Sequence, residues 1–364
     1  MHSNISPKAK RKYKVVGIAL AVLLLAPLAA LFMIRGVSSI MHRLPNRIQE
    51  KAYISLGGIE QYINVRGKSA QNPVVIWLHG GPGNPDTFLT TSFQRKMEDS
   101  YTFVRWDQRG CGRTYYKNKQ APLSWLQMLD DLDSLVDYAS DRFMQPIIIV
   151  GHSWGSALGS AYAAEHPDKI AGFVGIGQFI DGRLSDQLAA EAAAEMARSS
   201  GKERDARDIE AYYSIYEKAG FSSDDFDIKA FGKFRQLASK YLSPNDKNPS
   251  LAALMSPDFG WNDLRWNLKL MSNMNWYIGF FKPLNAALES FSPPDGFEVP
   301  VCFISGKNDF ICATKLVREY NIGLNTPSSE MFTIVNTGHY PMFDNSTAFK
   351  DCLDTALSKI LAKQ

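Results

Sequence analysis

Short apolar runs alternate with amphipathic segments through most of the chain, and this pattern predicts an α/β fold. The runs "PVVIWL" (73–78) and "IIIV" (147–150) are short and rich in β-branched residues, as buried strands are. The segment "SWLQMLDDLDSLVDYASDRF" (124–143) carries apolar residues at helical spacing and predicts an amphipathic helix. Strands that alternate with helices favour a mainly parallel sheet with helices on both faces.

Further strands follow from the same pattern. The stretch "YISLGGIEQYINVRG" (53–67) alternates between apolar and polar residues and turns at Gly57-Gly58, which predicts a β-hairpin. The segments "YTFVRWDQRGCG" (101–112) and "IAGFVGIGQFI" (170–180) each predict a strand, and the first ends in a glycine loop. The last two strands are expected in the ranges 299–310 and 330–343, each followed by a helix.

The middle of the chain has a different pattern. Residues 181–295 begin with a polar helical stretch and continue with a segment rich in Trp, Phe and Met, without a convincing buried strand. We therefore expect a helical cap there, inserted into a core that comprises residues 51–180 and 296–364. The Trp, Tyr and Phe residues of this segment are expected to pack in its core or to line an apolar pocket. These residues are Trp261, Trp266, Trp276, Tyr277 and Phe280.

The N-terminus carries an apolar run that predicts a membrane anchor. Residues 15–34 contain no charge and would span roughly 30 Å as a helix, which matches a bilayer core. A basic cluster lies within residues 1–14, so we expect a single-pass anchor (15–35) with a cytoplasmic N-terminus, a connector (36–50) and an extracytoplasmic body. The first alternative is a cleaved signal peptide, which usually has a shorter apolar core and a small-residue cleavage site. The second is an inverted anchor with a cytoplasmic body.

Composition and charge narrow the classes of function. The 364 residues are 45% hydrophobic and 21% charged, and the formal net charge is only +3, so no nucleic-acid partner is indicated. The four cysteines form no CxxC pair and have no histidine at zinc spacing, so we expect free or packed thiols. These cysteines are Cys111, Cys302, Cys312 and Cys352.

The stretch "VGHSWGS" (150–156) has the form of a nucleophile elbow. Ser153 stands between Gly151 and Gly155, after a predicted strand and before a helix rich in alanine. A serine nucleophile needs a base and an acid, which follow it along the chain in this fold. His339 is the only histidine after the elbow helix, and Asp309 is the favoured acid, with Asp181 as the alternative.

The remaining chemistry requires an oxyanion hole of backbone N–H groups. One group is expected from Trp154, directly after the nucleophile, and the other from the glycine loop "HGGPG" (79–83), with Gly81 as the favoured donor. Hydrolysis through an acyl-enzyme requires neither a metal nor a cofactor.

The motifs "HGGPG", "DQRGCGRT", "GHSWGS", "GKNDF" and "TGHYPMF", in this order, resemble the proline iminopeptidase family of α/β-hydrolases. The resemblance covers roughly residues 50–180 and 297–364. It implies Ser153 as nucleophile, Asp309 and His339 as its partners, and Gly81 and Trp154 as oxyanion donors. It also implies that Asp107 and Arg109 tie loops together beneath the site. Thr114 stands where the family usually has serine.

The resemblance implies an aminopeptidase that releases N-terminal proline or a similar residue from small peptides. Family members hold the free α-amine with carboxylates of the cap, and four glutamates are candidates here. They are Glu191, Glu195, Glu210 and Glu217. An esterase or lipase acting on a small acyl substrate is the first alternative, because it uses the same machinery. A non-catalytic binding protein is the second, although binding alone needs no nucleophile elbow.

Overall fold

The computed structural model describes residues 13–14, 16, 23, 25–26, 29–37, 39–40, 47–88, 93–243, 247, 253 and 256–363. Half of the apolar run predicted as the anchor, ten of residues 15–34, lies outside these residues. Within the described part of the chain, no helix combines the length and the apolar character needed to cross a membrane.

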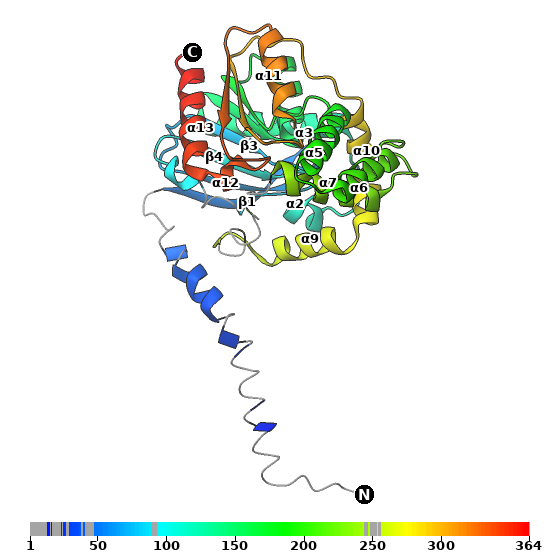
Figure 1. The fold of residues 1–364 in the computed structure, drawn as a ribbon. Helices are drawn as coiled ribbons and strands as arrows, with labels where there is room; N and C mark the ends of the chain where they lie inside the picture. Colours follow the sequence, from blue (N-terminus) through cyan, green and yellow to red (C-terminus); the bar gives the residue numbers. More distant parts are fainter. Residues whose placement is uncertain are drawn as a thin grey trace, which may run out of the picture.

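The described residues form one eight-stranded sheet in the order β1-β2-β4-β3-β5-β6-β7-β8 (Figure 1). The strands are β1 Ile48–Leu56, β2 Ile59–Gly67, β3 Val74–Leu78, β4 Thr102–Asp107, β5 Ile147–His152, β6 Gly172–Ile176, β7 Val301–Gly306 and β8 Ser329–Ile334. The first two pair as the predicted hairpin, and β2 pairs antiparallel with β4, whereas all other neighbours are parallel. The sheet starts at Ile48, inside the predicted connector.

Helices cover both faces of the sheet because the central strands bury side chains on both sides. In β3, Val74, Ile76 and Leu78 belong to one hydrophobic cluster, and Val75 and Trp77 belong to the other. The first cluster is completed by α2 (Gly112–Lys117), α3 (Trp125–Phe143), α4 (Trp154–Glu165) and α11 (Thr314–Gly323). The second is completed by the residues that flank η2 (Gln94–Lys96) and by α12 (Pro341–Asp344) and α13 (Ser346–Leu361).

A helical insertion connects β6 to β7. Its helices are α5 Gly182–Ser199, α6 Glu203–Tyr216, α7 Ile228–Leu242, α9 Trp261–Ser272 and α10 Met274–Glu289. Figure 1 shows these helices gathered on one side of the sheet. The described residues between β6 and β7 contain no strand, which agrees with the sequence expectation. α5, α6 and α7 have an apolar core of their own, formed mainly by alanines and aromatic rings.

The four cysteines are free, as expected: three are buried and Cys352 is partly buried.

Candidate active site

Ser153 lies at a sharp turn between β5 and α4. Its φ of 54° and ψ of −118° are strained for a residue with a side chain, as is typical of a nucleophile elbow. A Cβ on Gly151 would lie 2.2 Å from the carbonyl oxygen of Gly155, and one on Gly155 would lie 2.4 Å from that of Leu78. The turn therefore needs glycine at both flanks because neighbouring backbone occupies the space of a side chain.

His339 and Asp309 meet behind the carboxyl ends of β8 and β7. His339 Nδ1 and Asp309 Oδ2 are 2.9 Å apart, and both residues are buried. The second carboxylate oxygen, Oδ1, accepts hydrogen bonds from the backbone N–H groups of Ile311 and Cys312, each at 2.9 Å. These contacts fix both oxygens of Asp309, so one of them is held toward the imidazole.

Asp181, the alternative acid, has a different position. Its Oδ1 accepts a hydrogen bond from Leu184 N at 2.9 Å and caps the N-terminus of α5. The contact between Asp309 and His339 therefore favours Asp309 as the partner of the histidine.

A second histidine supports the loop that carries His339. His152 Nε2 lies 2.9 Å from the carbonyl oxygen of His339, and the two rings are 4.8 Å apart. Burial, together with the charge of His339, lowers the pKa of His152 to about 4, so this ring is neutral near pH 7. A neutral His152 can position the loop without placing a positive charge beside His339.

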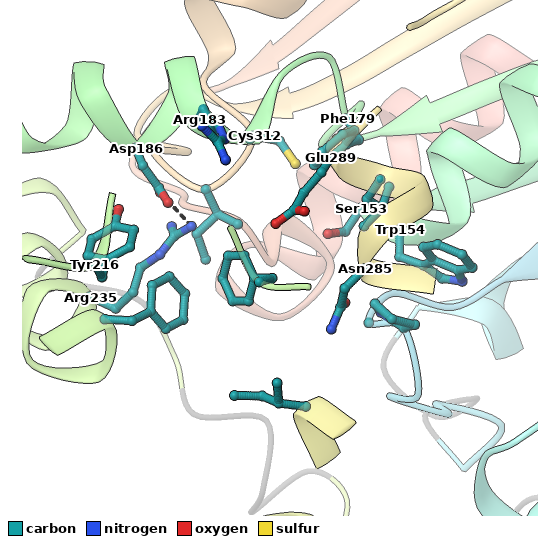
Figure 2. A pocket seen from close by; sticks show the side chains of 18 of the residues that line it. Ser153, Trp154, Phe179, Arg183, Asp186, Tyr216, Arg235, Asn285, Glu289 and Cys312 are labelled. Atoms are coloured by element: carbon teal, nitrogen blue, oxygen red, sulfur yellow. Dashed lines mark ion pairs between the residues drawn. The ribbon is translucent and has the colours of Figure 1, made fainter. Parts of the chain in front are cut away.

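Ser153 and His339 line one cavity of about 1130 Å³. Cys312 lines the same cavity, and Figure 2 shows its sulfur together with the hydroxyl of Ser153. Burial raises the pKa of this thiol well above its usual value, so the sulfur carries its proton. The wall of the cavity therefore carries a neutral thiol at Cys312.

The two expected oxyanion donors line the same cavity as Ser153. Trp154 is the first residue of α4, where a backbone N–H has no partner within the helix. Its indole Nε1 donates to Gln108 Oε1 at 2.9 Å, which fixes the side chain away from the backbone N–H. Gly81 has a φ of 133°, and a Cβ there would lie 2.4 Å from Gly83 N, so the glycine loop excludes larger residues at this point.

Charged residues beneath the site hold loops together, as the resemblance implied. Arg109 forms a two-pronged ion pair with Asp131 of α3, at 2.7 and 2.8 Å, and donates to the carbonyl oxygen of Gly57. Asp107 accepts from Thr87 Oγ1 and from Arg113 N. These pairs join the hairpin, α2 and α3 below the nucleophile.

The structure places the four candidate glutamates differently from one another. Of the four, only Glu217 lines the main cavity. Glu191 and Glu210 line a smaller hollow that shares Glu217, and Glu195 is exposed on α5. A carboxylate that sequence reasoning missed, Glu289 at the end of α10, lines the same cavity as Ser153 (Figure 2).

The cavity wall also holds polar groups of α10 and of the helices that face it. Asn285, one turn before Glu289, is buried, and its Nδ2 has no hydrogen-bond partner. Glu289 accepts a hydrogen bond from Ser222 N at 3.3 Å. Farther from the serine, Asp186 and Arg235 form an ion pair at 2.6 Å (Figure 2). Helical spacing on α10 places residues 285 and 289 on one face, but sequence alone does not show which face meets the cavity.

The aromatic residues of the insertion divide between packing and lining. Trp266 is buried and donates to the carbonyl oxygen of Gly83 at 2.8 Å, and Trp276 and Phe280 pack against the core. Tyr277 lines the cavity and donates to the carbonyl oxygen of Pro82 at 2.8 Å. Trp261 does neither, because its side chain is exposed.

No group of three or more potential metal ligands occurs among the residues that the structure describes.

Comparisons with known proteins agree with this geometry. The family described as "alpha/beta hydrolase fold" matches residues 73–346. A Bacillus subtilis (strain 168) protein named "Probable aminopeptidase YbaC" is 25% identical over 309 residues, which cover 82% of this chain and 93% of that protein. An Arabidopsis thaliana protein named "Proline iminopeptidase" is 25% identical over 299 residues, covering 76% and 71% of the two chains.

Among solved structures, that of a bacterial membrane phospholipase A has a TM-score of 0.52 with this chain. The two are 16% identical, and the alignment covers 96% of each, which is a likeness of fold alone. The family match, the curated relatives and the order of the motifs lead to one conclusion: this chain belongs to the α/β-hydrolase family and is a proline iminopeptidase-like member of it.

Proposed function

We propose that this hydrolase is a serine aminopeptidase in which Ser153 attacks the scissile carbonyl carbon. His339 takes the serine proton and passes it to the leaving amine, while Asp309 orients the imidazole and stabilises its cationic form. A water molecule activated by His339 then releases the acyl group and restores Ser153. The observation that carries the proposal is the convergence of three elements: a strained serine and a histidine in one cavity, with that histidine paired to a buried carboxylate.

Attack requires the serine hydroxyl to come within hydrogen-bond distance of His339 Nε2. Both side chains line the same cavity. Catalytic hydrogen bonds often tighten only when substrate is bound. The backbone N–H groups of Trp154 and Gly81 would then receive the developing oxyanion.

Glu289 supports an aminopeptidase. Glu289 lines the same cavity as Ser153, and its carboxylate would hold the α-ammonium group of a substrate's first residue (Figure 2). This assignment replaces the four glutamates proposed from sequence with one carboxylate on α10. A charge contact to the α-amine restricts cleavage to the first peptide bond, since an internal residue has no such group.

The test compares prolyl p-nitroanilide with its N-acetyl derivative. We expect the free amine to be cleaved and the acetylated form to be cleaved at least about tenfold less efficiently, since a charged hydrogen bond contributes about 1.5–3 kcal/mol. Glu289→Gln should remove most of this discrimination, and Glu195→Gln, on an exposed face of α5, should leave it unchanged. Equal cleavage of both substrates by the unaltered enzyme would contradict an aminopeptidase.

An ester hydrolase is the second candidate, and the cavity itself favours it. The cavity volume exceeds the range of about 300–1,000 Å³ usual for ligand sites, and aromatic and aliphatic side chains form much of the wall. These include Phe179, Phe221, Phe231, Leu270 and Ile278. A series of p-nitrophenyl esters of increasing chain length tests this candidate. Faster turnover of long acyl esters than of any aminoacyl anilide would favour it.

We further propose that residues 15–34 anchor the chain in the cell membrane, with the N-terminus in the cytoplasm and the hydrolase outside. The support is the uncharged run and the basic cluster that precedes it. Carbonate washing should leave the uncleaved chain in the membrane pellet, and protease added to spheroplasts should degrade the body. A shortened soluble chain would contradict the anchor, and protection of the body would contradict the orientation.

A further inference from the structure

Helix α9 exposes a row of large apolar side chains. Trp261, Leu268 and Met271 are 69%, 53% and 81% exposed. Their spacing along the helix places them on one side of it, and Met274, at the start of α10, is also exposed. Single exposed apolar residues are ordinary, but a row of them including a tryptophan indicates a surface with a partner.

The orientation of α9 is fixed by its opposite face. Trp266 is buried and hydrogen-bonded to Gly83, and Asp263 is buried in an ion pair with Arg113 at 2.5 Å. Rotation of the helix to bury Trp261 would break both contacts, including the ion pair that joins α9 to Arg113. The exposed apolar row is therefore a property of the folded protein.

The charges of α9 make its exposed side basic. The flank of the row carries Arg265 and Lys269, whose cations lie over the rings of Tyr116 and Trp276 at 4.3 and 3.6 Å. The one carboxylate of the helix, Asp263, is buried on the other side. Apolar residues with an interfacial tryptophan and flanking cations are the composition of helices that lie in a lipid headgroup layer.

The structure also connects α9 with the end of the proposed anchor. Arg35, the first residue after the apolar run, donates a hydrogen bond to the carbonyl oxygen of Phe259, two residues before α9 begins. Described residues that follow the run, Val37 and Ile40, are exposed as well. In Figure 1 α9 lies on the side of the body from which the described N-terminal helix extends.

We propose that α9 docks on the lipid surface, with Trp261, Leu268 and Met271 inserted at the boundary between headgroups and acyl chains. The proposal rests on the anchor proposed above, which brings this face to the bilayer. Arg265 and Lys269 lie where they meet anionic headgroups. Leu270 and Met274, beside the docked row, line the large cavity, so docking holds one wall of that cavity at the membrane.

The experiment uses the full chain in vesicles of phosphatidylethanolamine and phosphatidylglycerol that contain a doxyl-labelled lipid. An environment-sensitive fluorophore is attached at Leu268→Cys, in a background with Cys352→Ser. The matched control is Ile322→Cys, an apolar position that is 80% exposed on α11. Figure 1 shows α11 at the opposite end of the body from α9. A third label, at Leu25→Cys, reports on the anchor. Hydrolytic activity of each labelled protein confirms folding.

We expect the lipid quencher to reduce the Leu268→Cys signal at least about twofold more than the Ile322→Cys signal, because an interfacial helix inserts about 5–10 Å below the surface. Met271→Asp in the same chain should remove this difference. Quenching at position 25 without quenching at position 268 would overturn the docking of α9 and retain the membrane anchor. If neither position is quenched, both the docking and the anchor are overturned. A third outcome would be a blue shift of the fluorophore at position 268 in detergent that increases with protein concentration, without quenching by lipid. It would overturn docking on lipid and indicate that α9 contacts a second copy of the chain.

Discussion

Replacement of Asp309 by asparagine should invert the tautomer of His339. Two backbone N–H groups, from Ile311 and Cys312, donate to Oδ1 of Asp309 at 2.9 Å. In Asp309→Asn the amide oxygen must keep these donors, so the NH₂ group turns toward His339 Nδ1. The imidazole then accepts at Nδ1 and carries its proton on Nε2, where it can no longer take the proton of Ser153.

The structure gives the size of this effect. Turning the amide over to restore the tautomer would leave two buried N–H donors facing an NH₂ group. Each unsatisfied donor costs about 1–3 kcal/mol, so the wrong tautomer is favoured by about 2–6 kcal/mol. Turnover should therefore fall by roughly 30-fold to 10⁴-fold, while the fold persists because the asparagine has nearly the same shape.

The assay measures kcat with an aminoacyl anilide near neutral pH, together with the thermal unfolding midpoint. Asp181→Asn is the matched control, because asparagine caps helix α5 about as well as aspartate does and turnover should be unchanged. A loss below tenfold in Asp309→Asn, or a larger loss in Asp181→Asn, would refute the assignment of the acid.

Three further predictions concern the scaffold. Gly155→Ala should abolish activity and lower stability, because its Cβ would lie 2.4 Å from a backbone oxygen. Its control, Gly279→Ala on α10, has open space around the added Cβ and should leave activity unchanged and stability unchanged or slightly raised. Thermal unfolding followed by circular dichroism, together with kcat, checks both variants. Arg109→Ala should reduce the free energy of unfolding in urea by about 3–5 kcal/mol by leaving a buried carboxylate unpaired, with activity per folded molecule nearly retained. The pKa of His152 is about 4 in the folded protein, whereas an unperturbed histidine has a pKa of 6.5. Between pH 4 and 6.5 the unfolded chain therefore binds a proton at His152 that the folded protein does not bind. Stability should thus fall by about 3 kcal/mol as pH decreases from 6.5 to 4, and an unchanged slope in His152→Asn would contradict this.

Local sequence signals predicted much of the fold because each depends on few neighbours. The two glycines at 57–58 specify the tight hairpin between β1 and β2, and glycines at 151 and 155 specify the elbow around Ser153. His339 and Asp309 could be selected because each follows a strand, and parallel strands end at one edge of a sheet. Chain order alone left Asp181 as an alternative, which the observed contacts place at a helix cap.

The cavity wall was less accessible to prediction because it depends on how helices pack. Glu289 is one of many acidic residues along the insertion, and only the packing of α10 brings it to the wall of the cavity that Ser153 lines. The four glutamates proposed instead lie on α5, α6 and the residue after α6, and only Glu217 meets the main cavity. Likewise, composition indicated that Trp261 would be buried or line a pocket, and the structure exposes it, because Trp266 and Asp263 occupy the inner face of α9.

The central claim is that Ser153 is the nucleophile, and covalent labelling tests it most directly. The full-length protein would be treated with a fluorophosphonate, digested, and the modified residue located by mass spectrometry. The account predicts one stoichiometric adduct on Ser153, none in Ser153→Ala, and loss of hydrolysis in step with labelling. An adduct on another residue, or full turnover by Ser153→Ala, would contradict it.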